Sequence, residues 1–271
     1  MRRARPGDVI LVKPGVYRES VHIKKSGESG KPIHLKSSEK HKAVISGSKV
    51  VKEWAKHKPG VWSHVVKSRL FYFDKHLKLL DGKRIPGNQL YLDKEPLEWR
   101  DSLAQLVPGT WHLDIGTKTL YASFPTGKSP DNSLMELAVR PFTIRIDDES
   151  VSNIIIDGFH LTHAADSVKG SPRSLDLTGE NIIVVNNLVS WNSSYGISFR
   201  NLSDSRFEGN QCLWNGCLGF SGHTSTRCVF KGNQSWYNNW RLCNRSYCAG
   251  GMKILHSFDN IVENNEMAYN F

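Results

Sequence analysis

Four short segments in the second half of the chain carry polar side chains suited to acid, base or anion-binding chemistry. Each alternates apolar and polar residues, as a strand with one buried face does. They align as Leu175-Asp176-Leu177-Thr178, Ile197-Ser198-Phe199-Arg200, Phe220-Ser221-Gly222-His223 and Met252-Lys253-Ile254-Leu255. If these strands stack, one outward column contains Asp176, Ser198, Ser221 and Lys253, and the next contains Thr178, Arg200, His223 and Leu255.

A carboxylate, a guanidinium, an imidazole and an ammonium in one groove could act as acids and bases or hold an anionic group. We therefore predict Asp176, Arg200, His223 and Lys253 as catalytic residues, with Ser198 and Ser221 binding substrate. The alternative is an ordinary solvated face, because outward strand faces are often polar.

Two insertions, at 164–174 and 239–250, are expected to wall this groove. Trp240 and Arg241 open the second insertion, and we predict that both contact substrate, the indole by stacking on a sugar ring.

Other groups of reactive side chains give weaker signals. His160 and His163 could suggest a metal, but two histidines without a third ligand are usually structural, so no metal site is predicted. The five cysteines lie between 212 and 248 without the paired spacing of a zinc site. Cys243 and Cys248 are expected to be either a small disulfide ring or two thiols, and Cys212 a buried core residue.

An internal repeat must position these residues. One column of asparagines is followed, five residues later, by a second column, and an aromatic residue precedes each member of the second. The columns are Asn187, Asn210, Asn233 and Asn265; Asn192, Asn215, Asn238 and Asn270; and Trp191, Trp214, Tyr237 and Tyr269. An apolar column, Val184, Phe207, Phe230 and Val262, stands three residues before the first asparagines.

Coils of ~22–24 residues with insertions at one corner are what a three-sided parallel β-helix would give. The asparagines would tolerate a left-handed turn and hydrogen-bond between coils. A leucine-rich repeat lacks its leucine ladder here, and a propeller needs longer blades. We therefore predict an all-β, right-handed parallel β-helix.

The repeat does not run through the whole chain. Residues 1–48 read as the first coils, with strands at 9–12, 16–17, 21–23, 33–35 and 44–47. Residues 49–140 lack the repeat and have their own aromatic set, so we predict an inserted β-rich, sandwich-like subdomain. Its strands are expected at 61–66, 70–73, 77–80, 111–115 and 119–124, and residues 141–271 return to coils.

Composition narrows the classes of partner. The chain has 271 residues, a net charge of +10 and a mean hydropathy of −0.42. No apolar run reaches the ~18 residues of a membrane span, and no signal peptide is visible. The basic balance indicates an anionic partner, which could be nucleic acid, an anionic membrane or an acidic polysaccharide, or else only a solvated surface. Nucleic-acid motifs are missing from the sequence, and neither a nucleic-acid nor a membrane partner is expected.

The chain resembles pectate-lyase-like β-helix proteins in its opening run, Arg5-Pro6-Gly7-Asp8-Val9-Ile10-Leu11-Val12-Lys13-Pro14-Gly15-Val16-Tyr17-Arg18-Glu19. Further similar motifs are Gly30-Lys31-Pro32-Ile33, Val44-Ile45-Ser46-Gly47, Leu80-Asp81-Gly82-Lys83-Arg84 and Pro108-Gly109-Thr110-Trp111. Together they look like β-helix glycoside hydrolases with an inserted β-sandwich, of the glycoside hydrolase family 120 β-xylosidase type. That resemblance implies a pair of catalytic carboxylates, of which the aligned columns offer only Asp176, with Glu180 and Asp204 nearby.

We therefore expect a carbohydrate-active enzyme on a poly- or oligosaccharide, either a glycosidase or a lyase on an acidic glycan. The alternative is a non-catalytic glycan-binding or adhesin-like β-helix module. No cofactor is expected, except a divalent cation such as calcium if the protein is a lyase. The chain stops in mid-coil at Phe271, so we expect a fragment of a longer protein that is secreted or periplasmic.

Overall fold

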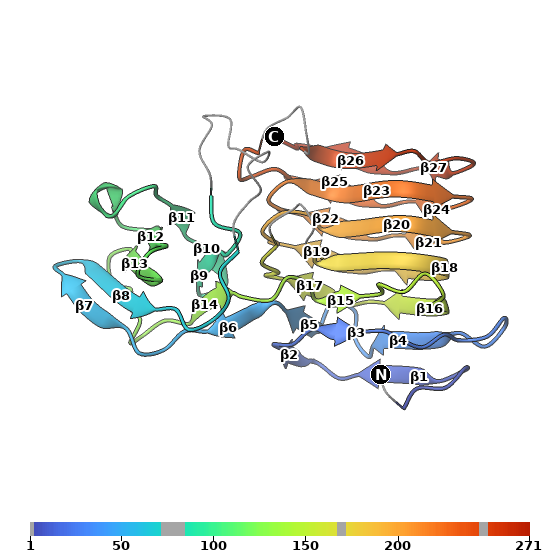
Figure 1. Cartoon of the computed structure of the whole chain (residues 1–271), viewed down its shortest axis with the longest axis horizontal. Coiled ribbons are helices and arrows are strands. Elements are labelled where there is room, and N and C mark those ends of the chain that lie inside the picture. Colours follow the sequence, from blue (N-terminus) through green and yellow to red (C-terminus); the bar gives the residue numbers. More distant parts are fainter. Residues whose placement is uncertain (1–2, 72–84, 167–171, 244–248) are drawn as a thin grey trace.

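The chain folds into stacked parallel coils with a β-rich lobe on one side (Figure 1). The structure is a computed structural model, and it describes residues 3–71, 85–166, 172–243 and 249–271. Within these ranges no helix has the length and apolar character needed to cross a membrane. The architecture is the predicted right-handed parallel β-helix with an inserted β-rich subdomain, and the N- and C-terminal ends lie at opposite ends of the stack.

Two parallel sheets form the coils. In the first, neighbouring strands are β1 (Val9–Val12), β4 (Ile33–Ser37), β16 (Ser152–Asp157), β18 (Leu175–Val185), β20 (Ile197–Ser203), β23 (Leu218–Thr226) and β26 (Gly250–Leu255). Shorter strands branch from it: β3 (Val21–His22), β15 (Ile144–Arg145), β21 (Arg206–Glu208), β24 (Val229–Lys231) and β27 (Ile261–Glu263). The second sheet contains β2 (Gly15–Tyr17), β5 (Ala43–Ser46), β17 (His160–Thr162), β19 (Leu188–Ser190), β22 (Gln211–Leu213), β25 (Gln234–Trp236) and β28 (Glu266–Ala268).

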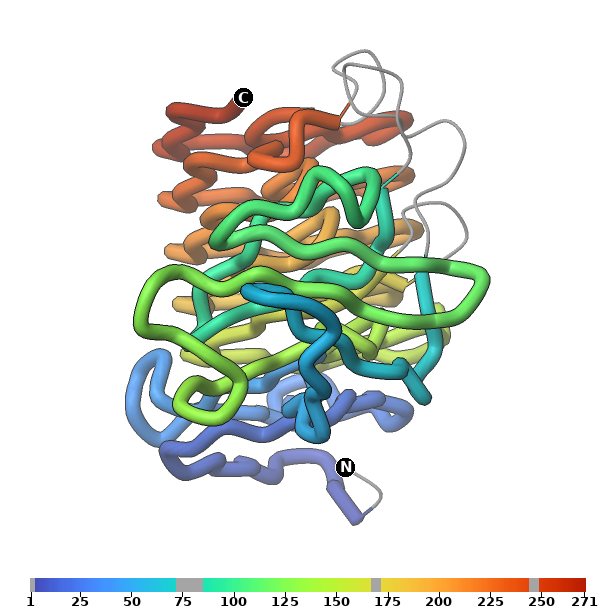
Figure 2. The backbone as a smooth tube through the Cα atoms, turned by 90° about the vertical axis from the view of Figure 1, so that its left-hand side faces the viewer, coloured from blue at the N-terminus to red at the C-terminus, as the bar shows by residue number. Residues whose placement is uncertain are grey.

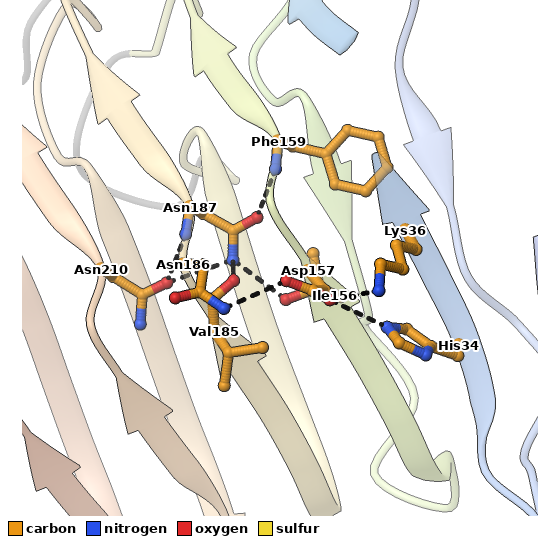
Figure 3. Close-up of polar contacts among 9 residues, drawn as sticks. All are labelled: His34, Lys36, Ile156, Asp157, Phe159, Val185, Asn186, Asn187 and Asn210. Atoms are coloured by element: carbon orange, nitrogen blue, oxygen red, sulfur yellow. Dashed lines mark hydrogen bonds and ion pairs between the residues drawn. The ribbon is translucent and has the colours of Figure 1, made fainter. Parts of the chain in front are cut away.

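The predicted asparagine columns are confirmed as hydrogen-bonded ladders, which are buried except for the last member of each. Asn187 Nδ2 donates to Asn210 Oδ1 at 3.1 Å, and the next two steps measure 3.0 and 2.8 Å. The same amide of Asn187 also donates to the carbonyls of Ile156 and Val185, while its Oδ1 accepts from the Phe159 backbone N–H (Figure 3). The second column repeats the pattern, with Asn192 Nδ2 2.9 Å from Asn215 Oδ1. Each amide therefore satisfies backbone groups that the turn would otherwise leave unpaired.

The left-handed turn conformation belongs to the residues before the ladder asparagines, not to the asparagines as predicted. In the first ladder these residues are Asn186, Gly209, Gly232 and Asn264, with φ between 54 and 60°. In the second ladder they are the aromatics, such as Trp214 at φ 54°. Their rings stack, with centroids 4.6 Å apart for Trp214 and Tyr237. The ladder asparagines therefore supply the hydrogen bonds, and the residues before them adopt the left-handed conformation of the turn.

The core inside the coils is apolar and follows the predicted register. Val184, Phe207, Phe230 and Val262 are direct partners on successive strands. Phe207 and Phe230 are fully buried and stacked, with centroids 4.9 Å apart. Cys212 occupies the column of Val189 and is fully buried, as predicted.

The lobe, which we define as strands β6 to β14, leaves the coils after β5 and returns before β15. One of its sheets contains β10 (Glu95–Pro96), β9 (Leu90–Leu92), β14 (Met135–Ala138) and β6 (Ser48–Val50). The other contains β11 (Glu98–Trp99), β12 (Thr110–Asp114), β13 (Thr119–Ser123), β8 (Val61–Val65) and β7 (Ala55–Lys58), with a short 3-10 helix, η1 (Leu103–Gln105), between β11 and β12. Turned by 90°, the lobe lies in front of the coil stack (Figure 2).

Several strands of the lobe were not predicted from the sequence. Those at 61–65, 110–114 and 119–123 agree with the sequence, and Asp114 Oδ1 accepts from the Thr117 N–H in the turn that joins the last two. The predicted strand at 77–80, the second half of that at 70–73 and the Leu80-to-Arg84 motif lie outside the described residues. Leu70 and Phe71, which are described, are not in a strand. β9 and β14 were missed, because both are buried on the two faces and show no alternation.

Candidate active site

The predicted outward columns form on the first parallel sheet. Strand pairing places Asp176 beside Ser198, Ser198 beside Ser221, and Ser221 beside Lys253. Arg200, His223 and Leu255 are partners in the next outward column. Thr178 is the exception, since the register shifts at a bulge between Leu177 and Gly179. We call the outward side of these two columns, from Asp176 to Lys253 and from Arg200 to Leu255, the Asp176 face.

Two residues from earlier coils extend the Asp176 column. β15 pairs with both β18 and β3, which sets Arg145 beside Asp176 and His22 beside Arg145. Arg145 Nε lies 3.3 Å from Asp176 Oδ2, and Arg145 Nη1 lies 3.1 Å from Asp147 Oδ2. His22 Nε2 also hydrogen-bonds Asp147 Oδ1. A single guanidinium therefore joins two carboxylates.

The two carboxylates have environments that shift their pKa values in opposite directions. Asp176 is only 4% exposed, and burial raises its pKa against the opposing charges of Arg173, Arg200 and Arg145. Asp147 is less enclosed: burial acts to raise its pKa, but the hydrogen bond from His22 and the charge of Arg145 lower it overall. The Asp176 carboxyl group therefore loses its proton at a higher pH than the Asp147 carboxyl group does.

The basic residues of the face differ in exposure. Arg200 and His223 are exposed, whereas Lys253 is half-buried. His223 Nδ1 is 2.6 Å from the Thr224 hydroxyl, and its ring lies 4.9 Å from that of His256. Ser198 is buried and Ser221 half-buried in the column between Asp176 and Lys253. The face therefore runs from a buried acidic end to a more open basic end.

Trp240 and Arg241, predicted to contact the same substrate, lie elsewhere. Arg241 is buried where the coils meet the lobe, and its guanidinium donates to the carbonyls of Pro86 at 3.0 Å and Asn88 at 3.2 Å and to the Gln89 side chain. Trp240 packs edge-on against Trp191, with centroids 5.9 Å apart. The contacts of Arg241 are therefore with the lobe, and its role in substrate binding stays a prediction.

We expect Arg241→Met to destabilise the fold. Methionine fills a similar volume but leaves buried carbonyls without donors, at a cost of about 2–3 kcal/mol of unfolding free energy. The matched control is Arg227→Met, which removes an exposed guanidinium paired with Asp204 and should cost less than about 1 kcal/mol. Urea unfolding followed by circular dichroism gives the unfolding free energy of each variant. Equal losses of unfolding free energy in the two variants would contradict the idea that Arg241 holds the lobe to the coils.

The cysteines and the two histidines have neighbours that the sequence did not indicate. Cys243 Sγ lies 2.8 Å from Cys217 Sγ, a partner that the sequence did not suggest, while Cys248 lies outside the described residues. His160 and His163 face the lobe on the second sheet. Across residues 3–71, 85–166, 172–243 and 249–271, no three His, Cys, Asp or Glu side chains gather closely enough to hold a metal ion.

Asp147, Arg145 and His22 were missed because they lie on coils where the repeat is interrupted. β3 and β15 have two residues each, and the lobe separates them in sequence. One signal was available: Ile144-Arg145-Ile146-Asp147 has the same apolar–polar alternation as Leu175-Asp176-Leu177-Thr178. Aligning the two segments would have placed Arg145 beside Asp176.

Comparison with solved structures identifies the architecture. The structure of XylC in complex with xylose matches with a TM-score of 0.74 and 16% sequence identity. The chain shares the β-helix fold of XylC. The alignment covers 97% of this chain and 58% of XylC, so the chain spans a little over half of that protein's length.

Two further structures match less closely. A glycoside hydrolase has a TM-score of 0.46 at 10% identity, covering 95% of this chain and 89% of its own. The pectate lyase Pel9A has a TM-score of 0.42 at 13% identity, covering 97% of this chain and 55% of its own. No family model and no curated protein matches the sequence.

Proposed function

We propose that this protein is carbohydrate-active and that its Asp176 face binds and cleaves a poly- or oligosaccharide. The observation that carries the proposal is the carboxylate pair on Arg145, with the pKa of Asp176 raised and that of Asp147 lowered. Glycosidases use two carboxyl groups within ~10 Å of each other, one protonated and one ionised. Contact with a shared guanidinium keeps Asp147 and Asp176 within that range.

Each carboxyl group then has a distinct role. Asp176 gives its proton to the glycosidic oxygen as the bond to the anomeric carbon breaks, so that the leaving sugar departs as a neutral alcohol. Asp147 supplies the electron pair on the other side, either by attacking the anomeric carbon or by taking a proton from the water that does. Arg145 holds both groups in place, and His22 keeps Asp147 ionised and oriented.

The rest of the face suits a chain-like substrate. Ser198, Ser221 and Lys253 repeat at the ~4.8 Å spacing of stacked strands, so hydroxyl and ammonium donors follow the coil axis. XylC, which shares the fold, has been solved with xylose bound. A sugar ligand for the present chain is therefore a natural first test, although fold alone does not determine function.

A second candidate is a lyase acting on an acidic glycan, favoured by the exposed Arg200 and His223 in the adjacent column. The guanidinium would bind the uronate carboxylate and the imidazole would take a proton from the sugar ring. Such elimination leaves an unsaturated product that absorbs in the near ultraviolet, whereas hydrolysis does not. The product therefore separates the two reactions, and a protein that binds glycans without turnover would be a binding module.

Hydrolysis at this face should follow a bell-shaped pH profile. Activity is lost as the pH falls through the lowered pKa of Asp147, which must be ionised. It is lost again as the pH rises through the raised pKa of Asp176, which must be protonated. We expect this profile when release of reducing ends from xylan and from polygalacturonate is measured across pH, with no unsaturated product.

His223→Ala provides the control for that experiment. A hydrolase using the two carboxylates should keep the same two pH limbs in this variant, whereas a lyase using His223 as its base should lose activity. Unsaturated product together with loss of activity in His223→Ala would contradict the glycosidase hypothesis and support the lyase hypothesis.

A further inference from the structure

Two cysteine side chains meet where the lobe joins the coils. Cys217 lies directly before β23, and Cys243 lies in the second insertion. Their Sγ atoms are 2.8 Å apart, and both side chains are fully buried. A disulfide bond has a length of ~2.05 Å, so the two sulfur atoms need to approach by less than about 1 Å to form one.

A hydrogen-bonded turn holds Cys243 against the coil that carries Cys217. Asn239 Oδ1 accepts from the Cys243 backbone N–H at 2.9 Å, and Asn239 Nδ2 donates to the Cys243 carbonyl at 3.3 Å. The Asn239 backbone N–H donates in turn to the Asn215 carbonyl at 2.8 Å. Because Asn215 stands two residues before Cys217, these backbone contacts fix the position of one cysteine relative to the other.

The pair lies at the junction between the two parts of the molecule. One buried apolar cluster contains both cysteines together with Ile85 of the lobe. Arg241, two residues before Cys243, donates to two lobe carbonyls at 3.0 and 3.2 Å. A bond between Cys217 and Cys243 would therefore fasten to the coils the segment that holds the lobe.

Two of the other cysteines lie in a different part of the molecule. Cys212 and Cys228 belong to the apolar core inside the coils, which is a separate cluster. Burial raises the pKa of both thiols, so they stay protonated and react slowly in thiol–disulfide exchange. The described contacts thus favour the pairing of Cys217 with Cys243, and Cys248 is the alternative partner that an experiment must test.

We propose that Cys217 and Cys243 form a disulfide bond that fastens the second insertion to the coils. The bond forms during folding, before the turn buries the two sulfur atoms, by exchange with a small-molecule disulfide such as oxidised glutathione. One cysteine thiolate attacks the glutathione disulfide and releases one glutathione, and the second thiolate attacks the protein sulfur of the mixed disulfide and releases the other. The two protein thiols lose two electrons and two protons, which convert one oxidised glutathione into two glutathione thiols.

The bond has a consequence for stability that does not depend on the chemistry of the Asp176 face. It joins residues that are 26 positions apart in the sequence. A cross-link over a loop of this length restricts the unfolded chain, so the oxidised protein should melt about 5–10 °C above the reduced protein. Since the sulfur atoms are buried, the folded protein should keep the bond in a mild thiol reductant.

Peptide mapping identifies the bond directly. The whole chain would be refolded from urea in oxidised or in reduced glutathione, alkylated and digested with trypsin, which cuts after Arg241 and Arg245 and so separates Cys243 from Cys248. In the oxidised sample we expect the peptide with Cys243 to be cross-linked to the peptide with Cys217. A link between Cys243 and Cys248, or complete alkylation of Cys217 and Cys243 in the oxidised sample, would overturn the proposal.

Two variants separate this bond from other effects of the redox conditions. Cys217→Ala cannot form it, so the melting temperature should be the same after refolding in oxidised and in reduced glutathione. Cys248→Ala keeps the pair and should retain the difference of about 5–10 °C. Because Cys212 falls in the same tryptic peptide as Cys217, fragment ions between them identify the linked sulfur. A link through Cys212, loss of the difference in Cys248→Ala, or its persistence in Cys217→Ala would each contradict the proposed pairing.

Discussion

Asp176→Asn should reduce the rate of glycosidic cleavage by about 10²–10⁴-fold, the range that a positioned general acid contributes. Asparagine has the shape of the protonated carboxyl group but has no proton to give to the leaving oxygen. Because burial raises the pKa of Asp176, the neutral amide should be tolerated next to Arg145, and the melting temperature should change little. Initial rates on a natural xylan and thermal unfolding measure the two effects.

A substrate with a good leaving group makes this test specific. An aryl glycoside whose phenol departs without protonation does not need a general acid, so Asp176→Asn should retain much more activity on it than on xylan. Asp204→Asn, which changes an exposed carboxylate paired with Arg227, should behave as the wild type on both. Equal losses on both substrates would show that Asp176 is not the acid.

The sequence was sufficient for the coils because stacking imposes a period on it. Each coil must place an amide, an apolar residue and a turn at the same height as its neighbours, so Asn187, Asn210 and Asn233 recur at one spacing. The outward columns follow from the same register, which is why Asp176, Ser198 and Ser221 were correctly aligned. Constraints of this kind recur in every coil, so they can be recognised from the spacing of residues in the sequence.

Contacts that cross between coils and lobe leave no such period. Arg241 meets Asn88, and Arg18 meets Glu136, across more than a hundred residues of sequence. A single buried arginine or histidine looks the same in the sequence whether it contacts ligand or lobe, so the contacts of Arg241 with the lobe could not be predicted from its place in the second insertion. The carboxylate partner Asp147 was hidden in the same way, because the lobe interrupts the repeat just before it.

Asn210→Ala is expected to destabilise the coils strongly, with a loss of about 3 kcal/mol or more of unfolding free energy. The side chain is fully buried, and its Oδ1 accepts from both the backbone N–H and the amide of Asn187. Its Nδ2 donates to the Val184 carbonyl at 2.8 Å and to Asn233. Alanine leaves these buried groups unpaired, at about 1–3 kcal/mol for each.

The adjacent Gln211 provides the matched control. It begins β22 directly after Asn210 and forms the same kind of amide contact, with its Nε2 2.7 Å from Gln234 Oε1, but it is only half-buried. Gln211→Ala should therefore cost less than about 1 kcal/mol, because water replaces the lost partner. Urea midpoints for the two variants give the comparison. A loss in Asn210→Ala no larger than in Gln211→Ala would mean that apolar stacking of Phe207 and Phe230, rather than the buried amides, holds successive coils in register.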